Sequence, residues 1–216
     1  EKIIEWYDKM GVDGIFAVCQ SSEMFELDAE ERYELGKFVI EHAPKHMSVV
    51  CSGHVAEQVE DQIREAQRMI DAGCKEYVFI SNQLAREDEN EDVVKRRVEY
   101  LLNHIQADGF GIYECPYPYK RVLSAGLLRW LALTGKFKFL KDTCCDVLQL
   151  KAKADAVRGT GLKIYNANGA TLLQSLKDGC AGYSGVMANF YPDLISYLVK
   201  NFEDGSEIIV ELMDFI

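Results

Sequence analysis

A lysine and a tyrosine each stand at the end of an apolar run. Lys141 follows residues 137–140 (FKFL), and Tyr113 follows residues 109–112 (GFGI). If both runs are strands, alternation points Lys141 the same way as Phe139, towards the interior. Burial disfavours the charged ammonium, so it lowers the pKa of a lysine and makes the amine nucleophilic. A nearby phenol could relay protons to and from the adduct of that amine with a carbonyl group.

Both residues also have an ordinary structural interpretation. A strand lysine usually extends its ammonium to water or pairs with a carboxylate, as we expect for Lys136 and Lys138. A tyrosine is often a half-buried ring whose hydroxyl binds water. The position of Lys141 at the end of its run favours a chemical role, and Tyr113 gains significance only from facing the same end of the sheet.

A polar loop stands at a third position of this kind. The apolar run 14–19 (GIFAVC) ends in residues 20–23 (QSSE), and a helix signal begins at Asp28. Such a loop could be a plain turn, a phosphate cradle or a binding loop. The lack of glycine argues against a phosphate cradle, in which backbone N–H groups approach the anion closely. Glu23 is expected to brace the loop, and a plain turn is an alternative for Ser22.

Other common catalytic constellations are not indicated. His54 is the only histidine near the expected strand ends, and a lone histidine is more typical of a loop than of a base. No group of His, Cys and Asp residues has metal-ligand spacing. No P-loop occurs, and Gly159-Thr160-Gly161 precedes a strand signal, which is the wrong order for a dinucleotide site. We therefore expect neither a metal nor an organic cofactor.

The elements that would position these residues alternate regularly. Continuous apolar runs, typical of parallel strands covered on both faces, are separated by helix signals. The strand-like runs are 13–19, 46–52, 77–81, 109–115, 137–142, 162–167 and 181–187. The helix-like segments are 29–42, 55–73, 89–106, 122–134, 146–158 and 169–178, with another after residue 190. Asp28 and Glu31 have capping-box spacing, and four glycines are expected to end helices: Gly11, Gly73, Gly135 and Gly179.

This alternation predicts an α/β fold with a parallel sheet. The regular spacing favours a (β/α)8 TIM barrel, forming one catalytic domain over residues 1–216, over an open doubly wound sheet. The chain opens in a helix signal at residues 1–7 and ends in the apolar stretch 208–213. A full barrel usually has about 250 residues. We therefore expect a first strand and C-terminal helices to be missing from this chain.

The amino-acid composition and the net charge indicate which binding partners and which cellular compartment suit the protein. The 216 residues are 48% hydrophobic and 27% charged, as in an ordinary globular protein, and the formal net charge is −11. That charge repels phosphate backbones, so nucleic-acid binding is not expected. No apolar run is long enough to cross a membrane. Seven cysteines, scattered through apolar runs, are typical of reduced thiols in a cytoplasmic protein.

Several segments, in order along nearly the whole chain, resemble the dihydrodipicolinate synthase / N-acetylneuraminate lyase family of Schiff-base-forming barrel enzymes. Residues 19–23 (CQSSE) stand where the family carries G-T-T-G-E or G-S-T-G-E. Residues 113–116 (YECP) match its Y-x-x-P, and residues 139–143 (FLKDT) its G-[IVL]-K-[DE]. Residues 182–189 (GYSGVMAN) stand at its G-x-I-S-x-x-A-N. The combination is fairly specific, whereas no single motif is.

The resemblance implies a (β/α)8 barrel followed by extra C-terminal helices, and a homotetramer or dimer. It implies that Lys141 forms a Schiff base with pyruvate, that Tyr113 relays protons and that Ser21 binds the pyruvate carboxylate. Further substrate-binding residues are implied at Gln20, Ser22, Ser184 and Gly185. The partners would be a 2-keto acid such as pyruvate and an aldehyde-type co-substrate.

The chain departs from the family pattern around the site. Gln20 replaces the first loop threonine, which in dihydrodipicolinate synthase belongs to a hydroxyl relay with two tyrosines. Residues 82–83 (NQ) stand where the second of those tyrosines is expected. Lys120 and Arg121 lie slightly beyond the position of an arginine that binds the second substrate. These departures argue against dihydrodipicolinate synthase activity more than against carbonyl activation by Lys141.

The sequence therefore predicts a class I lyase of the aldolase type that acts on pyruvate or another 2-keto acid. One alternative is a dehydratase or hydratase-aldolase for 2-keto-3-deoxy sugar acids on the same scaffold. Another is a sensor that binds a keto acid without turnover. A phosphate-binding barrel is a weaker interpretation, because only Ala167-Asn168-Gly169 and Ser184-Gly185 faintly resemble its glycine-rich loop.

Overall fold

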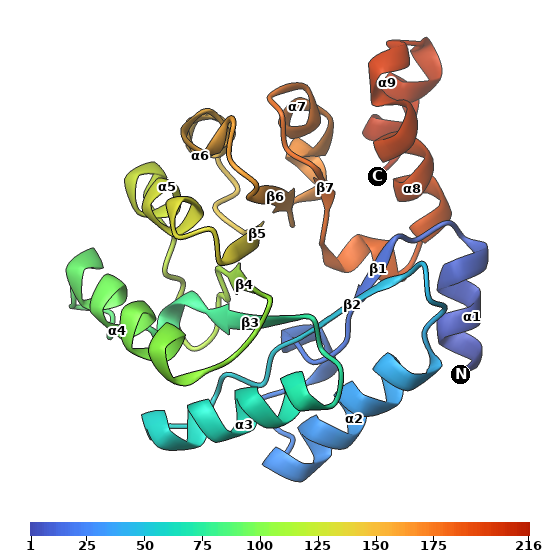
Figure 1. The fold of residues 1–216 in the computed structure, drawn as a ribbon. Coiled ribbons are helices and arrows are strands. Elements are labelled where there is room, and N and C mark those ends of the chain that lie inside the picture. Colours follow the sequence, from blue (N-terminus) through green and yellow to red (C-terminus); the bar gives the residue numbers. More distant parts are fainter.

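Seven strands form one parallel sheet in the computed structural model, which describes residues 1–216. Their order in the sheet is their order in the sequence, and each neighbouring pair is parallel. The strands are β1 Gly14–Phe16, β2 Ser48–Cys51, β3 Glu76–Ile80, β4 Gly109–Tyr113, β5 Phe137–Asp142, β6 Lys163–Asn166 and β7 Gly182–Tyr183. The sheet curls, and the helices lie around its outer side (Figure 1).

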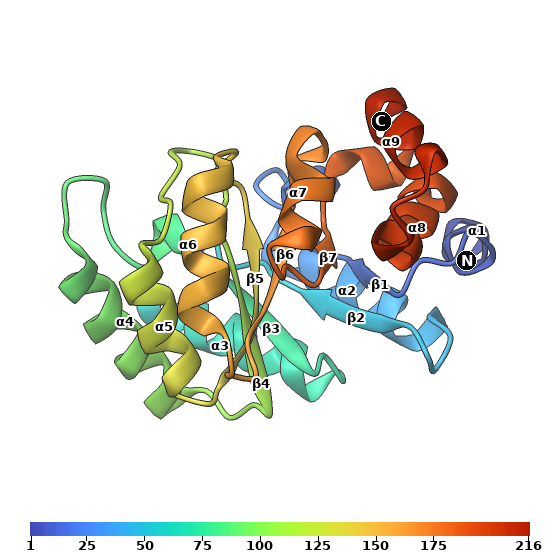
Figure 2. The same ribbon diagram turned by 90° about the horizontal axis from the view of Figure 1, so that it is seen from above.

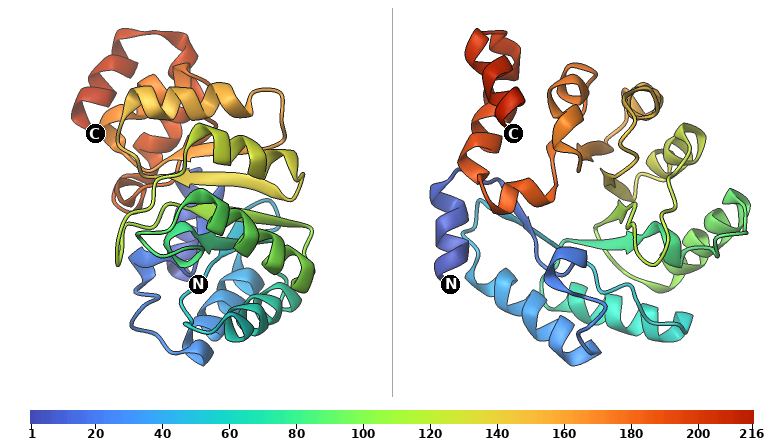
Figure 3. Two further views of the ribbon diagram at one scale, coloured as in Figure 1. Left: turned by 90° about the vertical axis from the view of Figure 1, so that its left-hand side faces the viewer. Right: turned by 180° about the vertical axis from the view of Figure 1, so that it is seen from behind.

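Helices connect the strands and continue after the last one. They are α1 Lys2–Lys9, α2 Ala29–His42, α3 Val59–Asp71, α4 Glu91–His104, α5 Ala125–Leu133, α6 Val147–Val157, α7 Leu172–Lys177, α8 Pro192–Asn201 and α9 Glu207–Phe215. Seen from behind, they follow one another around the sheet in sequence order (Figure 3, right). None of them combines the length and the apolar composition that a membrane-spanning helix needs.

The predicted strand–helix alternation and parallel sheet are confirmed, and so are the local signals that mark the helix ends. The Asp28 carboxylate accepts hydrogen bonds from the N–H groups of Glu30 and Glu31 at 2.8 and 2.9 Å, and Glu31 accepts one from the Asp28 N–H. The four glycines expected to end helices all have positive φ. The predicted runs 13–19 and 181–187 are longer than β1 and β7, the two strands that have a neighbour on one side only.

The ring of strands is open between β1 and β7, which do not pair with each other. A cavity of about 450 Å³ lies between them and is lined by residues of both strands and of α8. The helical layer is continuous at this point, because α1 lies beside α8 (Figure 2). The Tyr7 hydroxyl donates a hydrogen bond to Asn189 Oδ1 at 3.1 Å, and Lys200 Nζ donates one to the Gly11 carbonyl at 2.9 Å. The architecture is that of a TIM-barrel-like curled sheet, and the complete eight-stranded barrel stays a prediction.

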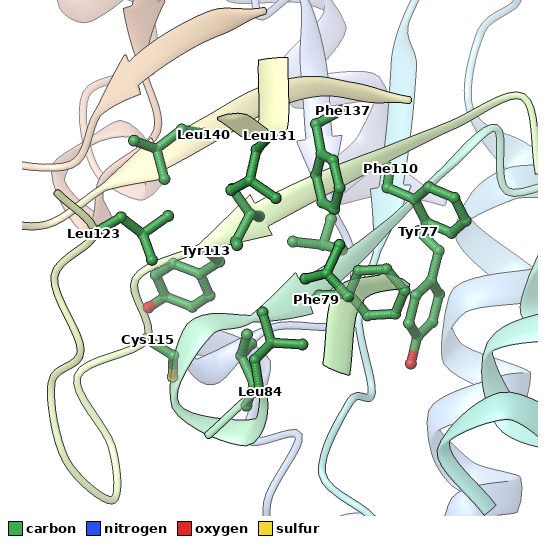
Figure 4. Packing of buried hydrophobic residues seen from close by; sticks show 14 of the residues in the cluster. Tyr77, Phe79, Leu84, Phe110, Tyr113, Cys115, Leu123, Leu131, Phe137 and Leu140 are labelled. Atoms are coloured by element: carbon green, nitrogen blue, oxygen red, sulfur yellow. The ribbon is translucent and has the colours of Figure 1, made fainter. Parts of the chain in front are cut away.

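The main hydrophobic core lies between the middle strands and their helices. The rings of Phe79 and Phe110 are stacked with their centroids 5.0 Å apart, and Phe137 packs against both (Figure 4). Tyr113 and Cys115 are buried at the edge of the same cluster. The carboxyl ends of β4 and β5 therefore pack against the main hydrophobic core.

Candidate active site

Lys141 and Tyr113 are brought together, as their places at the ends of two apolar runs predicted. They are register partners on β5 and β4. Lys141 Nζ lies 4.4 Å from the centroid of the Tyr113 ring and 5.2 Å from that of Phe16. Lys141 is only 8% exposed, and no carboxylate forms an ion pair with it. An isolated amine therefore faces two aromatic rings inside the curled sheet.

Burial shapes the protonation of both groups. It lowers the pKa of Lys141, and the neighbouring thiols Cys19 and Cys115 oppose this shift. The same desolvation raises the pKa of Tyr113, so its phenol keeps its proton at neutral pH. The site thus combines an amine of lowered pKa, which can act as a nucleophile, with a protonated hydroxyl, which can act as a proton donor. Addition of an amine to a carbonyl group needs both.

The loop after β1 reaches this pair through Gln20. The loop forms a short 3-10 helix, Gln20–Ser22. The Tyr113 hydroxyl donates a hydrogen bond to Gln20 Oε1 at 3.3 Å, and Cys115 Sγ lies 3.9 Å from the same oxygen. An amide oxygen accepts hydrogen bonds but carries no transferable proton. A relay of hydroxyl groups therefore cannot continue from Tyr113 through Gln20.

The two serines of the loop face different surroundings. The Ser22 hydroxyl accepts a hydrogen bond from the Cys19 N–H at 2.8 Å, and it lies 2.8 Å from the Ala17 carbonyl and 3.0 Å from that of Cys19. These contacts close the loop on itself, as a turn residue does. Ser21 is exposed. Its role as the carboxylate anchor stays a prediction.

Ser184 and Gly185 follow β7, two strands away from Lys141 in the sheet. The Ser184 N–H donates to the Asn166 carbonyl at 2.8 Å, and Ser184 lines the cavity between β1 and β7. A Cβ at Gly185 would lie 2.3 Å from the Tyr183 hydroxyl and 2.4 Å from the Ala167 carbonyl, so this close approach requires glycine. Substrate binding by these two residues also stays a prediction.

His54 is a structural residue. It is fully buried, and its Nδ1 accepts a hydrogen bond from the Ile80 N–H at 3.2 Å. Its Nε2 lies 3.1 Å from Gln62 Oε1, so the neutral ring can donate there. Burial lowers the pKa of His54 to about 4, although the hydrogen bonds with Gln62 and Ile80 raise it. The ring is thus a neutral cross-link between β3 and α3, with no access to the site.

The proline-rich segment after β4 is held in place by Asn82, at the position where the family resemblance expects a tyrosine. Asn82 Nδ2 lies 2.7 to 2.9 Å from three carbonyl oxygens: those of Cys115, Tyr117 and Tyr119. Lys120 donates to the Thr143 carbonyl at 2.6 Å, and Arg121 donates to the Glu89 carbonyl at 3.1 Å. Both side chains thus contact backbone carbonyls, and the carbonyl that Lys120 contacts lies two residues beyond Lys141.

A buried charge cluster directly behind the site was not predicted from the sequence. Glu114 and Asp142 follow the two site residues in the chain, and both contact Lys153 of α6. The Lys153 and Glu114 side chains meet at 2.5 Å, and all three side chains are at most 2% exposed. The available signal was a carboxylate inside each apolar run, at Glu114 and Asp142. Its partner Lys153 gives no such signal, because other charged residues, Lys151 and Asp155, stand beside it in the same helix-like segment.

Comparison with known proteins identifies the fold family. The model of the dihydrodipicolinate synthetase family matches residues 1–214. The chain belongs to the dihydrodipicolinate synthetase family. The resemblance seen in the motifs around Tyr113 and Lys141 is thereby confirmed.

A curated relative in this family, YagE of Escherichia coli (strain K12), is provisionally named a 2-dehydro-3-deoxy-D-gluconate aldolase. It is 27% identical to this chain over 203 residues, which are 91% of the chain. The chain spans 65% of the length of YagE, slightly less than two thirds.

Several solved structures share the fold. YagE in complex with pyruvate superposes with a TM-score of 0.87 at 23% identity, covering 99% of this chain and 72% of YagE. Dihydrodipicolinate synthase from Acinetobacter baumannii, complexed with pyruvate, gives 0.87 at 21% identity with the same coverage. A 2-keto-3-deoxygluconate aldolase from Picrophilus torridus gives 0.85 at 17% identity, covering 98% of this chain and 74% of that one.

Proposed function

We propose that this chain carries the catalytic centre of a class I, aldolase-type lyase that binds pyruvate or another 2-keto acid as an imine of Lys141. The observation that carries the proposal is the buried Lys141 amino group, which has no carboxylate partner and lies against the Tyr113 ring, at the carboxyl ends of two parallel strands. Active sites of TIM barrels lie at this end of the strands. The family match and the named relatives support the reaction class.

Imine formation uses the protonation states of the pair. The neutral amine of Lys141 attacks the C2 carbonyl carbon, and Tyr113 transfers the proton that the nitrogen loses to the carbonyl oxygen, which gives a carbinolamine. Tyr113 then donates its own proton to that hydroxyl, which leaves as water, and the phenolate of Tyr113 remains. The protonated imine withdraws electrons from C3 and C4. Ser21 is the residue that we expect to hold the carboxylate during these steps.

The imine then assists cleavage of the C3–C4 bond. The Tyr113 phenolate takes the proton of the C4 hydroxyl, the C3–C4 bond breaks, an aldehyde departs, and the bonding electrons pass into an enamine on Lys141. Tyr113 returns this proton to C3. Addition of water, which gives one proton back to Tyr113, then releases pyruvate and restores the amine. Run in reverse, the same steps condense pyruvate with an aldehyde-type co-substrate.

Among aldolase-type substrates, 2-keto-3-deoxy sugar acids are favoured over those of dihydrodipicolinate synthase. Gln20 takes the Tyr113 hydrogen bond and cannot pass the proton on. The sugar acid can supply its own C4 hydroxyl next to the phenol, so no protein relay is needed. The names of YagE and of the Picrophilus torridus aldolase agree with this class.

A dehydratase or hydratase-aldolase is the second candidate, because the same imine also assists loss of a hydroxyl as water. Product analysis separates the two: an aldolase releases pyruvate and an aldehyde, whereas a dehydratase keeps the carbon chain intact. A keto-acid sensor would form the imine and release no product. Assembly as a dimer or homotetramer and a cytoplasmic location remain predictions.

Borohydride reduction in the presence of pyruvate tests the proposal. We expect the reduced adduct on Lys141, located by peptide mass spectrometry of the full-length protein. Lys141→Ala should abolish both the adduct and turnover, whereas Lys138→Ala on the same strand should keep both. An unmodified Lys141, or full activity in Lys141→Ala, would refute the mechanism.

A further inference from the structure

The charge cluster formed by Glu114, Asp142 and Lys153 lies on the opposite face of the sheet from the site. Successive strand residues point to opposite faces, so Glu114 and Asp142 turn outward where Tyr113 and Lys141 turn inward. There α6 brings Lys153 between the two carboxylates. One ammonium thus spans the two strands that carry the proposed catalytic pair, one residue beyond each.

The two carboxylates also hold the backbone that follows the strands. Glu114 Oε2 accepts the Thr143 N–H and Oε1 accepts the Leu123 N–H, both at 2.9 Å. Asp142 Oδ1 accepts the Cys144 N–H at 3.0 Å. The Glu114 N–H in turn donates to the Lys141 carbonyl at 3.1 Å.

The cluster depends on its single cation. Two carboxylates in a space without water would repel each other and would take up protons or move apart. Burial alone would lower the pKa of Lys153, but Glu114 and Asp142 together raise it, so Lys153 stays charged. Without that charge, the carboxylates lose the partner that holds them on adjacent strands.

We propose that Lys153 is a positioning residue, which sets the separation and register of Tyr113 and Lys141 by linking Glu114 to Asp142 behind them. The proposal rests on the proposed imine chemistry of Lys141. Lys153 touches no reacting atom. It fixes the strand ends so that the amine and the phenol meet the same carbonyl group, and a displacement of about 1 Å in such a pair can slow a reaction by roughly 100-fold.

The test compares two variants of the full-length protein with a matched control. Lys153→Met removes the cation. Glu114→Gln combined with Lys153→Met removes one charge of each sign, so it breaks the link while keeping the formal charge of the cluster. Lys151→Met, on the same helix, removes an exposed lysine that pairs with Asp155 at 2.7 Å. Circular dichroism and thermal melting show which variants are folded at the assay temperature.

At saturating pyruvate, we expect trapping at Lys141 to be about 10- to 100-fold slower in both cluster variants. The half-saturating pyruvate concentration should change little, and Lys151→Met should behave as the wild type. Because the double variant keeps the formal charge of the cluster, slow trapping in it would show that the lost contact between Glu114 and Lys153 causes the effect, and not a change in charge. If a folded cluster variant traps pyruvate at the wild-type rate, the inference is wrong.

Hydrogen exchange separates this inference from the proposed function. The amides of Thr143 and Cys144 should exchange faster in both cluster variants, whereas those of β3 should keep their wild-type rates. Unchanged exchange at Thr143 and Cys144 would overturn the positioning role. If the wild type itself forms no imine with pyruvate, the proposed function fails, and the exchange rates alone decide whether Lys153 holds the strand ends.

Discussion

Tyr113 is a protonated phenol whose ring and hydroxyl have different partners. The ring lies under Lys141 Nζ, and the hydroxyl donates to Gln20. Removing the hydroxyl alone should keep the packing of the lysine and remove the proton donor. Tyr113→Phe is therefore expected to lower kcat by about 100-fold or more, as loss of a general acid does.

The matched control is Tyr165→Phe. Tyr165 is the register partner of Lys141 on β6, and its ring packs against Phe139 at 6.0 Å. Steady-state rates with a 2-keto-3-deoxy sugar acid compare the two variants. Equal losses in both would show that the Tyr113 hydroxyl has no special role.

His54 makes the fold sensitive to acid. Its pKa is about 4 in the folded chain against an ordinary 6.5, so the stability it contributes is present above pH 6.5 and is lost as pH falls through 4. A pKa shift of this size corresponds to a loss of about 3 kcal/mol in the free energy of unfolding.

Glu114 has the opposite pH dependence. Burial raises its pKa from 4.5 to about 6, so its contribution to stability is present below pH 4.5 and is lost as pH rises through 6.

Denaturant unfolding at several pH values isolates the histidine. His54→Gln should flatten the loss of stability between pH 6.5 and 4, because the variant has no imidazole that must stay neutral. The contribution of Glu114 is common to both proteins and cancels in the difference. Parallel pH curves for wild type and variant would contradict this prediction.

At the scale of the elements, the Phe139 ring of β5 lies against its register partner on β4, Gly111. A Cβ on Gly111 would lie 2.2 Å from the end of the Phe139 ring, so an alanine must displace that ring. Overfilled sites of this kind usually cost about 1 to 3 kcal/mol. Gly111→Ala should lower the free energy of unfolding by that amount and should also disturb Lys141, which follows Phe139 on the same face.

Gly161→Ala is the control for this substitution. A Cβ there meets no atom within 4 Å, and its φ is not left-handed. Its free energy of unfolding should stay within about 0.5 kcal/mol of the wild type. If Gly111→Ala is as stable as Gly161→Ala, the interior beside Phe139 is less tightly packed than the structure indicates.

The elements were predictable because each leaves a local signal. Continuous apolar runs give buried parallel strands, and the Asp28–Glu31 spacing gives a helix start. Lys141 and Tyr113 could be paired because both end such runs. The link from Glu114 to Lys153 could not be predicted, because it joins a residue just beyond β4 to a residue of α6 that is 39 positions away, and only the folded chain sets which way the two side chains face. The use of the Ser22 hydroxyl within its own loop depends likewise on how the loop folds back.

At the scale of the whole molecule, the sheet is unevenly supported. β3, β4 and β5 have hydrogen-bonded neighbours on both sides, whereas β1 and β7 each have one. In this 216-residue chain, we expect the amides of Gly14–Phe16 and Gly182–Tyr183 to exchange much faster than those of β4, as marginally supported edges do. Native-state hydrogen exchange measures this difference, and uniform protection across the sheet would contradict it.

The contact between α1 and α8 has a consequence for how the chain folds. Strands pair only with their sequence neighbours, so the sheet can grow one βα unit at a time from short-range contacts. The Tyr7–Asn189 and Gly11–Lys200 hydrogen bonds join residues 182 and 189 positions apart. Bringing such distant segments together has a large cost in loop-closure entropy. We therefore expect these contacts to form after the rate-limiting step of folding and to break early in unfolding. Weakening them should therefore speed unfolding and leave the folding rate almost unchanged.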